Sequence, residues 1–135
     1  MNNHTNDHEK KLVLVVDDEP RILRFVSLSL SSLGFTVIKA STGEEGLQMV
    51  ASERPDAMIL DIFMPGLDGF DVLRQLRTSE DKEGRHHLPV IVFSARSSAA
   101  EQAFALGATD FVSKPFLPEE IAEKLEAALD HRNGN

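Results

Sequence analysis

Short runs of apolar residues recur along this chain, and each is followed by a segment whose apolar residues have helical spacing. The run Leu12–Val16 has no polar position and is rich in valine, as in a strand buried on both faces. Because such strands need helices between them, the alternation predicts an α/β fold: a doubly wound parallel sheet of five strands with five helices. The other predicted strands are Phe35–Lys39, Ala57–Leu60, Pro89–Phe93 and Asp110–Ser113, the last of them half polar.

Helix caps and helix breakers separate the predicted strands. Ser98 and Glu101 have the spacing of a capping box, which predicts the start of the fourth helix. The segment Thr78–Leu88 is polar and charged, and we expect it to be a solvated loop after the third helix. The other signals are Pro20 and Gly34 for the first helix, Thr42 for the second, Asp68 for the third and Gly107 for the end of the fourth. The spacing of Pro118, Ile121, Leu125, Ala128 and Leu129 predicts a fifth, amphipathic helix.

The chain has 135 residues, the length of one domain. We expect polar tails at residues 1–10 and 132–135 around one folded unit at 11–131. The absence of cysteine excludes a disulfide scaffold and a cysteine-ligated metal site. A formal net charge of −8 repels nucleic-acid phosphates, so we expect no nucleic-acid binding. No apolar run reaches the roughly 18 residues of a membrane span and no apolar leader is present, which predicts a cytoplasmic protein without membrane contact.

Polar side chains follow four of the predicted strands. The first strand ends on Asp17 and Asp18, the third on Asp61, the fourth on Ser94 and the fifth near Lys114. Ligands of open α/β sheets bind at this edge, where the strand order reverses. In a sheet of order 2-1-3-4-5 the first and third strands are neighbours. Three carboxylates would then converge on one crevice, flanked by a hydroxyl and an ammonium group.

This combination of groups points to a particular chemistry. Carboxylates a few ångströms apart repel each other, and protonation or a cation must relieve the repulsion. Oxygen ligands without histidine or cysteine favour a hard cation such as Mg²⁺. A lysine and a hydroxyl across the crevice suit an anionic phosphoryl group. The set therefore predicts a phosphoryl-transfer site with a carboxylate nucleophile.

Four segments of the chain, in this order, resemble the response-regulator receiver domain of two-component signalling, the phospho-accepting partner of a histidine kinase: LVVDDEP, ILDIFMPGLDG, VIVFSA and FVSKPF. The resemblance covers about residues 11–131. Chemotaxis-type receivers are among the family members that the chain resembles. The resemblance implies a flavodoxin-like sheet of order 2-1-3-4-5 and a module switched by phosphorylation. It also implies that the chain is not an enzyme, apart from phosphorylating and dephosphorylating itself. The implied partner is a histidine kinase or a phosphotransfer protein.

The resemblance assigns the phosphoacceptor and the metal ligands. Asp61 matches the phosphorylated aspartate of the family. Asp18, Asp61 and the backbone carbonyl of Phe63 would hold Mg²⁺, with Asp17 assisting through water, and Mn²⁺ would substitute.

The resemblance also assigns the residues that contact the phosphoryl group and the surface that responds to it. Ser94 would bond a phosphoryl oxygen, Lys114 would pair with the phosphoryl group, and Phe111 matches an aromatic switch residue. The fourth helix, fifth strand and fifth helix, Ser98–Leu106 and Asp110–Leu129, would then form a partner or homodimer surface.

The chain departs from the commoner family pattern in three places. Phe111 stands where many members have tyrosine, so a hydroxyl contact is lost. Leu117 stands where a capping Ser, Thr or Asp is more usual, and the spacing from Asp61 to Ser94 is stretched by a few residues. The resemblance further implies a cis peptide bond between Lys114 and Pro115.

Two other classes of function compete with this interpretation. A Mg²⁺-dependent phosphohydrolase with an aspartyl-phosphate intermediate would share the same kinds of group. However, one such family has DxDx[TV] after its first strand, where this chain has DDEP. A pseudo-receiver would take no phosphate and act as a constitutive adaptor, and the full set of predicted site residues argues against it.

Overall fold

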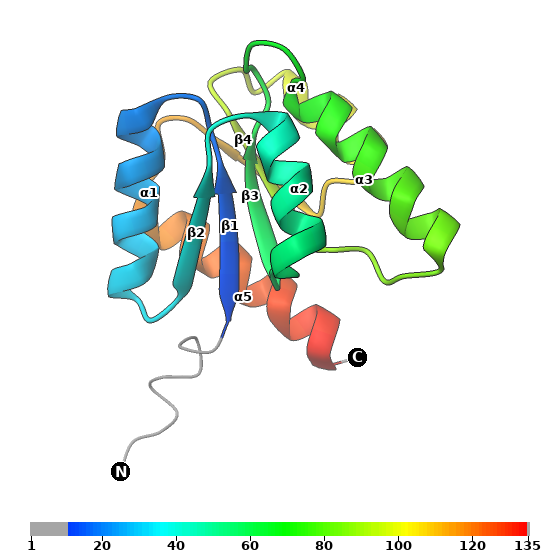
Figure 1. Cartoon of the computed structure of the whole chain (residues 1–135). Coiled ribbons are helices and arrows are strands. Elements are labelled where there is room, and N and C mark those ends of the chain that lie inside the picture. Colours follow the sequence, from blue (N-terminus) through cyan, green and yellow to red (C-terminus); the bar gives the residue numbers. More distant parts are fainter. Residues whose placement is uncertain (1–10, 135) are drawn as a thin grey trace.

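Five parallel strands form one sheet in the order β2-β1-β3-β4-β5 (Figure 1). The computed structural model describes residues 11–134, and for residues 131–134 the backbone alone. The predicted tail at residues 1–10 therefore lies outside the described residues. The predicted flavodoxin-like sheet is confirmed. Its strands are β1 (Leu12–Val16), β2 (Thr36–Ala40), β3 (Ala57–Asp61), β4 (Val90–Ser94) and β5 (Asp110–Ser113).

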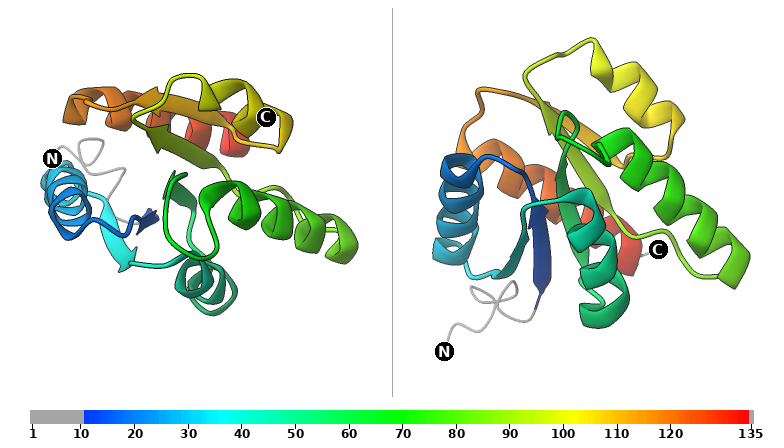
Figure 2. Two further views of the ribbon diagram at one scale, coloured as in Figure 1. Left: turned by 90° about the horizontal axis from the view of Figure 1, so that it is seen from above. Right: turned by 45° about the horizontal axis from the view of Figure 1, so that its top comes forward.

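Helices cover both faces of the sheet (Figures 1 and 2). On one face α1 and α5 pack against the strands, and on the other face α2, α3 and α4 do so. The helix α5 continues into the segment 132–135 that the sequence predicts as a tail. The helices are α1 (Pro20–Ser32), α2 (Gly43–Glu53), α3 (Gly69–Glu83), α4 (Ala99–Ala105) and α5 (Pro118–Gly134).

The core lies on both sides of the sheet. In β1, Val13 and Val15 pack toward α1 and α5, while Leu14 and Val16 pack toward α2 and α3. All four side chains are fully buried, which explains why β1 has no polar position. Among residues 11–134, none of the helices has the length and apolar composition that a membrane span requires.

The predicted solvated loop at Thr78–Leu88 is wrong for residues 78–83, because α3 continues to Glu83. The helix is capped by Gly84, whose φ is +67°, and residues 84–88 form a loop as predicted. The last turns of α3 carry a buried ion pair. Nη1 of Arg77 donates to Oε1 of Glu80 over 2.8 Å, and Oε2 of Glu80 accepts the backbone N–H of Leu88 over 2.7 Å. Charged residues that suggested solvent exposure are thus part of the helix, and Glu80 is only 1% exposed.

The predicted N-cap residues are correct for α2 and α3 and wrong for α4. Thr42 Oγ1 accepts the N–H of Glu45 at the start of α2, and Asp68 forms a reciprocal capping box at the start of α3. Ser98 does not cap α4, since its backbone is already helical and its side chain accepts no N–H group. The chain enters α4 through a turn, in which the N–H of Ala99 donates to the carbonyl of Arg96 over 3.0 Å.

Candidate functional site

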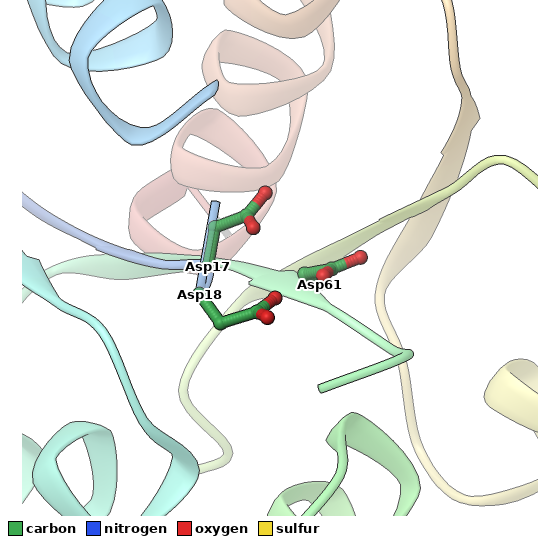
Figure 3. A group of neighbouring side chains, drawn as sticks. All are labelled: Asp17, Asp18 and Asp61. Carbon is green, nitrogen blue, oxygen red and sulfur yellow. The ribbon is translucent and has the colours of Figure 1, made fainter. Parts of the chain in front are cut away.

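Three carboxylates lie together at the carboxyl edge of the sheet (Figure 3). Asp17 and Asp18 directly follow β1, and Asp61 is the last residue of the adjacent strand β3. One carboxylate oxygen from each residue lies within 4.8 Å of the others. The predicted convergence of these side chains is therefore confirmed.

Burial makes the negative charges of this cluster costly. Asp61 is 4% exposed, and burial together with the charge of Asp17 raises its pKa from 3.8 to about 6, against the opposing effect of Lys114. Burial also raises the pKa of Asp17, although its Oδ1 accepts the backbone N–H of Glu19 over 2.8 Å. A positive charge nearby would therefore stabilise the ionised carboxylates of this cluster.

Lys114 supplies one positive charge from the end of β5. Its Nζ lies 3.3 Å from Oδ1 of Asp61 and 3.4 Å from Oδ2 of Asp17. The same nitrogen lies 4.6 Å from the ring centroid of Phe93, and the backbone N–H of Lys114 donates to the carbonyl of Ser94. The bond between Lys114 and Pro115 is cis, as the resemblance implies. One ammonium against three carboxylates leaves the crevice negative.

Ser94 and Phe111 lie on the two strands beside this cluster. Ser94 is the last residue of β4 and is fully buried, and its Oγ accepts the backbone N–H of Arg96 over 3.1 Å. Phe111 is half-buried in β5, opposite Val92 of β4, and packs against the core on the α3 and α4 side. The structure therefore places Ser94 at the same edge of the sheet, whereas Phe111 lies further back along its strand.

Two residues of the site have no place in the sequence interpretation. The guanidinium carbon of Arg96 lies 4.5 Å from the ring centroid of Phe63, so a cation–π contact joins the loops after β4 and β3. Gly69 approaches the end of β3 so closely that a Cβ there would lie 2.4 Å from the carbonyl oxygen of Asp61. Two sequence features could have indicated these residues. Arg96 lies two positions after Ser94, and Gly69 is the last residue of ILDIFMPGLDG.

The side chains present fit a hard divalent cation. The cluster offers only carboxylate oxygens, its net charge is negative, and two of its three members are buried. Mg²⁺ typically binds one or two carboxylates and retains water, and this cluster can supply that set.

Comparison with known proteins agrees with this geometry. The chain matches the response regulator receiver domain family over residues 13–126. Response regulator MprA of Mycobacterium ulcerans is 44% identical over 119 residues, which cover 87% of this chain and 49% of that protein. MprA of Mycobacterium avium is 44% identical over the same length, with 50% of its chain covered. The chain thus spans about half the length of these curated relatives.

Solved structures show the same fold. A putative response regulator from Chloroflexus aurantiacus has a TM-score of 0.80 and 31% identity, and the match covers 88% of this chain and 97% of that one. Response regulator TrrA of Thermotoga maritima, in complex with Mg²⁺ and BeF, has a TM-score of 0.77 and 32% identity, with 87% and 98% covered. The chain therefore belongs to the response-regulator receiver domain family and is a receiver domain of two-component signalling.

Proposed function

We propose that Asp61 accepts a phosphoryl group from a phosphohistidine of a histidine kinase or phosphotransfer protein. The proposed metal ligands are Asp18, Asp61 and the carbonyl of Phe63, with Asp17 acting through water, and Mg²⁺ or Mn²⁺ is the ion. One observation carries this proposal: the carboxylate of Asp61 lies at the carboxyl edge of the sheet, beside both an ammonium group and two further carboxylates. Receiver domains bind Mg²⁺ at such a cluster, and TrrA was solved with it.

The proposed transfer step is a displacement at phosphorus. An oxygen of ionised Asp61 forms the new O–P bond while the P–N bond to the donor imidazole breaks. The leaving nitrogen keeps the electron pair and takes up a proton from water. The bound cation would offset the repulsion between the carboxylates and the incoming anion.

Lys114 and Ser94 are the proposed contacts of the phosphoryl group. Nζ of Lys114 already faces Asp61, so it can pair with a phosphoryl oxygen after small movements. The hydroxyl of Ser94 accepts a backbone N–H, which leaves its own hydrogen free to be donated to a phosphoryl oxygen. Such a bond requires Ser94 to move inward, toward Asp61.

We propose α4, β5 and α5 as the surface that responds. Phe111 of β5 lies half-buried beneath this surface, and Phe104 of α4 is 48% exposed on it. Lys124 of α5 lies 3.5 Å from the carboxylate of Asp110 and joins the helix to the strand. The occupant would be a partner protein or a second copy of this chain.

The proposal extends to where the domain acts. The charge of −8 supports the absence of nucleic-acid binding by this segment. We place the domain in the cytoplasm, where its proposed donor kinase would meet it. Cell fractionation tests this location.

The test of the phosphoacceptor is labelling with acetyl phosphate and MgCl₂, read by intact mass. We expect one phosphoryl group on the wild type, none with EDTA, and none on Asp61→Asn. The matched control is Asp81→Asn, which changes an exposed aspartate of α3 and should be labelled normally. Full labelling of Asp61→Asn would refute the assignment, and no labelling of any variant would favour the pseudo-receiver. Rapid turnover of a small phosphate ester would favour the phosphohydrolase.

A further inference from the structure

A positively charged segment stands out in this acidic chain. Residues 20–40 contain three basic side chains and no acidic one, although the whole chain has a net charge of −8. This segment forms α1 and β2, which lie side by side at one edge of the molecule (Figure 1). A groove of about 500 Å³ lies between them, within the usual size range of small-ligand sites.

Each wall of this groove contributes one basic side chain. Arg24 comes from α1 and Lys39 from β2, and both are exposed. Within the described part of the chain, neither has a carboxylate oxygen within 4.0 Å. The two charges that face the groove are therefore not neutralised by the protein itself.

The groove also contains an unsatisfied hydroxyl group. Ser27 of α1 lines it and is 7% exposed. Of the buried side-chain nitrogen and oxygen atoms between residues 11 and 130, Oγ of Ser27 alone has no hydrogen-bond partner. Buried hydroxyls in folded proteins normally have one. An acceptor atom from a bound ligand would supply the missing partner.

The remaining lining is largely apolar. Leu23 and Leu28 of α1 and Val37 of β2 contribute hydrocarbon surface beside the basic groups. We propose that this groove binds a small amphiphilic anion. A phosphate or carboxylate group would lie between Arg24 and Lys39, and a short apolar body would pack against the leucines and the valine. This site is separate from Asp61 and does not depend on the function proposed for it.

The test is a titration of the protein in EDTA with phenyl phosphate and, separately, with phenylacetate. Binding is followed by amide chemical shifts and calorimetry. Without a cation the carboxylate cluster repels both anions, so signals come from the groove. We expect saturable binding of one anion, with shifts at Ser27 and Lys39. Benzyl alcohol, which has the same ring and no charge, should not saturate.

Variants decide whether the groove itself is responsible. Replacing both Arg24 and Lys39 by glutamine should weaken binding by about tenfold or more, because charge-assisted hydrogen bonds are lost. Ser27→Ala should weaken it less while the protein stays folded. The matched control is Arg21→Gln, which removes an exposed charge of the same helix that does not line the groove. It should leave affinity within about twofold.

Four results of the titrations would overturn the proposal, and the vesicle experiment below adds a fifth. They are the absence of saturation, equal loss of affinity in Arg21→Gln, shifts confined to Ser94 and Lys114, and equal binding of benzyl alcohol. A lipid headgroup carries the same anionic chemistry, so vesicles containing phosphatidic acid form a further arm. Co-sedimentation that needs Arg24 and Lys39 would refute a soluble ligand, and its absence alongside saturable binding supports one.

Discussion

Nζ of Lys114 lies 3.3 Å from Oδ1 of Asp61, across the sheet edge from β5 to β3. The ammonium group therefore reaches the atom that we propose as nucleophile, and it would also meet the transferred oxygens. Lys114→Met should slow labelling by acetyl phosphate about 100-fold, because a positioned charge at the transferring group is lost. Lys82→Met, an exposed change on α3, is the control. If Lys114→Met is labelled within about twofold of the wild-type rate, Lys114 does not contribute to the transfer step.

The raised pKa of Asp61 has a consequence for stability. In the metal-free protein this pKa is about 6, above its ordinary 3.8, so the folded state binds the proton more tightly than the unfolded state does. The ionised form therefore destabilises the fold above pH 6, and this effect disappears as the pH falls from 6 to 4. Asp61→Asn should raise the free energy of unfolding by about 2–3 kcal/mol at pH 7.5 in EDTA and by little near pH 4.

Urea unfolding at both pH values measures this difference. Asp130→Asn, at an exposed position of α5, is the control and should change stability little at either pH. The pKa of Asp17 is raised as well, so its protonation acts in the same direction in the wild type. A gain from Asp61→Asn that is the same at pH 7.5 and pH 4 would show that packing, not charge, is its cause.

A bound cation should stabilise the protein through the same carboxylates. At a free Mg²⁺ concentration ten times the dissociation constant, the free energy of unfolding should rise by about 1.4 kcal/mol. Asp18→Asn should reduce this gain strongly, because one of the clustered oxygens is then uncharged. Thermal unfolding with increasing MgCl₂, against NaCl at matched ionic strength, measures the effect. Equal stabilisation by both salts would contradict a specific site.

The convergence of the carboxylates was predictable because these residues follow strands and because the family resemblance implies the order of the strands. Asp17 and Asp61 each follow a run of buried residues, and parallel neighbours bring their carboxyl ends to one edge of the sheet. That relation needs only the strand positions and their order. The contact between Arg96 and Phe63 was not predictable in this way, because it depends on the paths of two loops.

The end of α3 shows the other limit of prediction from sequence. Arg77 and Glu80 have helical spacing, but their burial depends on distant partners: Nη2 of Arg77 donates to the carbonyl of Gly107 over 2.7 Å, and Glu80 accepts the N–H of Leu88. Neither partner can be identified from the local pattern. A charged segment therefore suggested solvent where the structure has a buried network.

This network should be important for stability. Glu80→Ala leaves the guanidinium of Arg77 buried without its carboxylate and should cost about 3–5 kcal/mol. Arg74→Ala breaks the exposed ion pair with Asp71 on the same helix and should cost less than about 1 kcal/mol. Urea unfolding of both variants measures the contrast. Similar small losses would mean that solvent reaches Arg77 once Glu80 is removed.

The last prediction concerns how occupancy of the site changes the surface of α4, β5 and α5. If Ser94 moves inward to meet a phosphoryl oxygen, space opens beneath α4, and the half-buried ring of Phe111 can turn in to fill it. Burying more of that ring gains about 1–2 kcal/mol, so the response is a population shift of roughly tenfold. Phe111 has no hydroxyl group, and its effect on a partner or second copy must be steric.

Sedimentation velocity with and without beryllofluoride, a phosphoryl mimic, tests this switch in the wild type, Phe111→Ala and Phe104→Ala. The mimic should change self-association of the wild type and have little effect on Phe111→Ala, because the ring that responds is missing. Phe104→Ala removes an exposed ring of the same surface, so it should weaken association at both states of the site and keep the response to the mimic. If the mimic shifts association equally in the wild type and Phe111→Ala, Phe111 is ordinary packing, and the signal must leave the site through Ser94 and α4 without it.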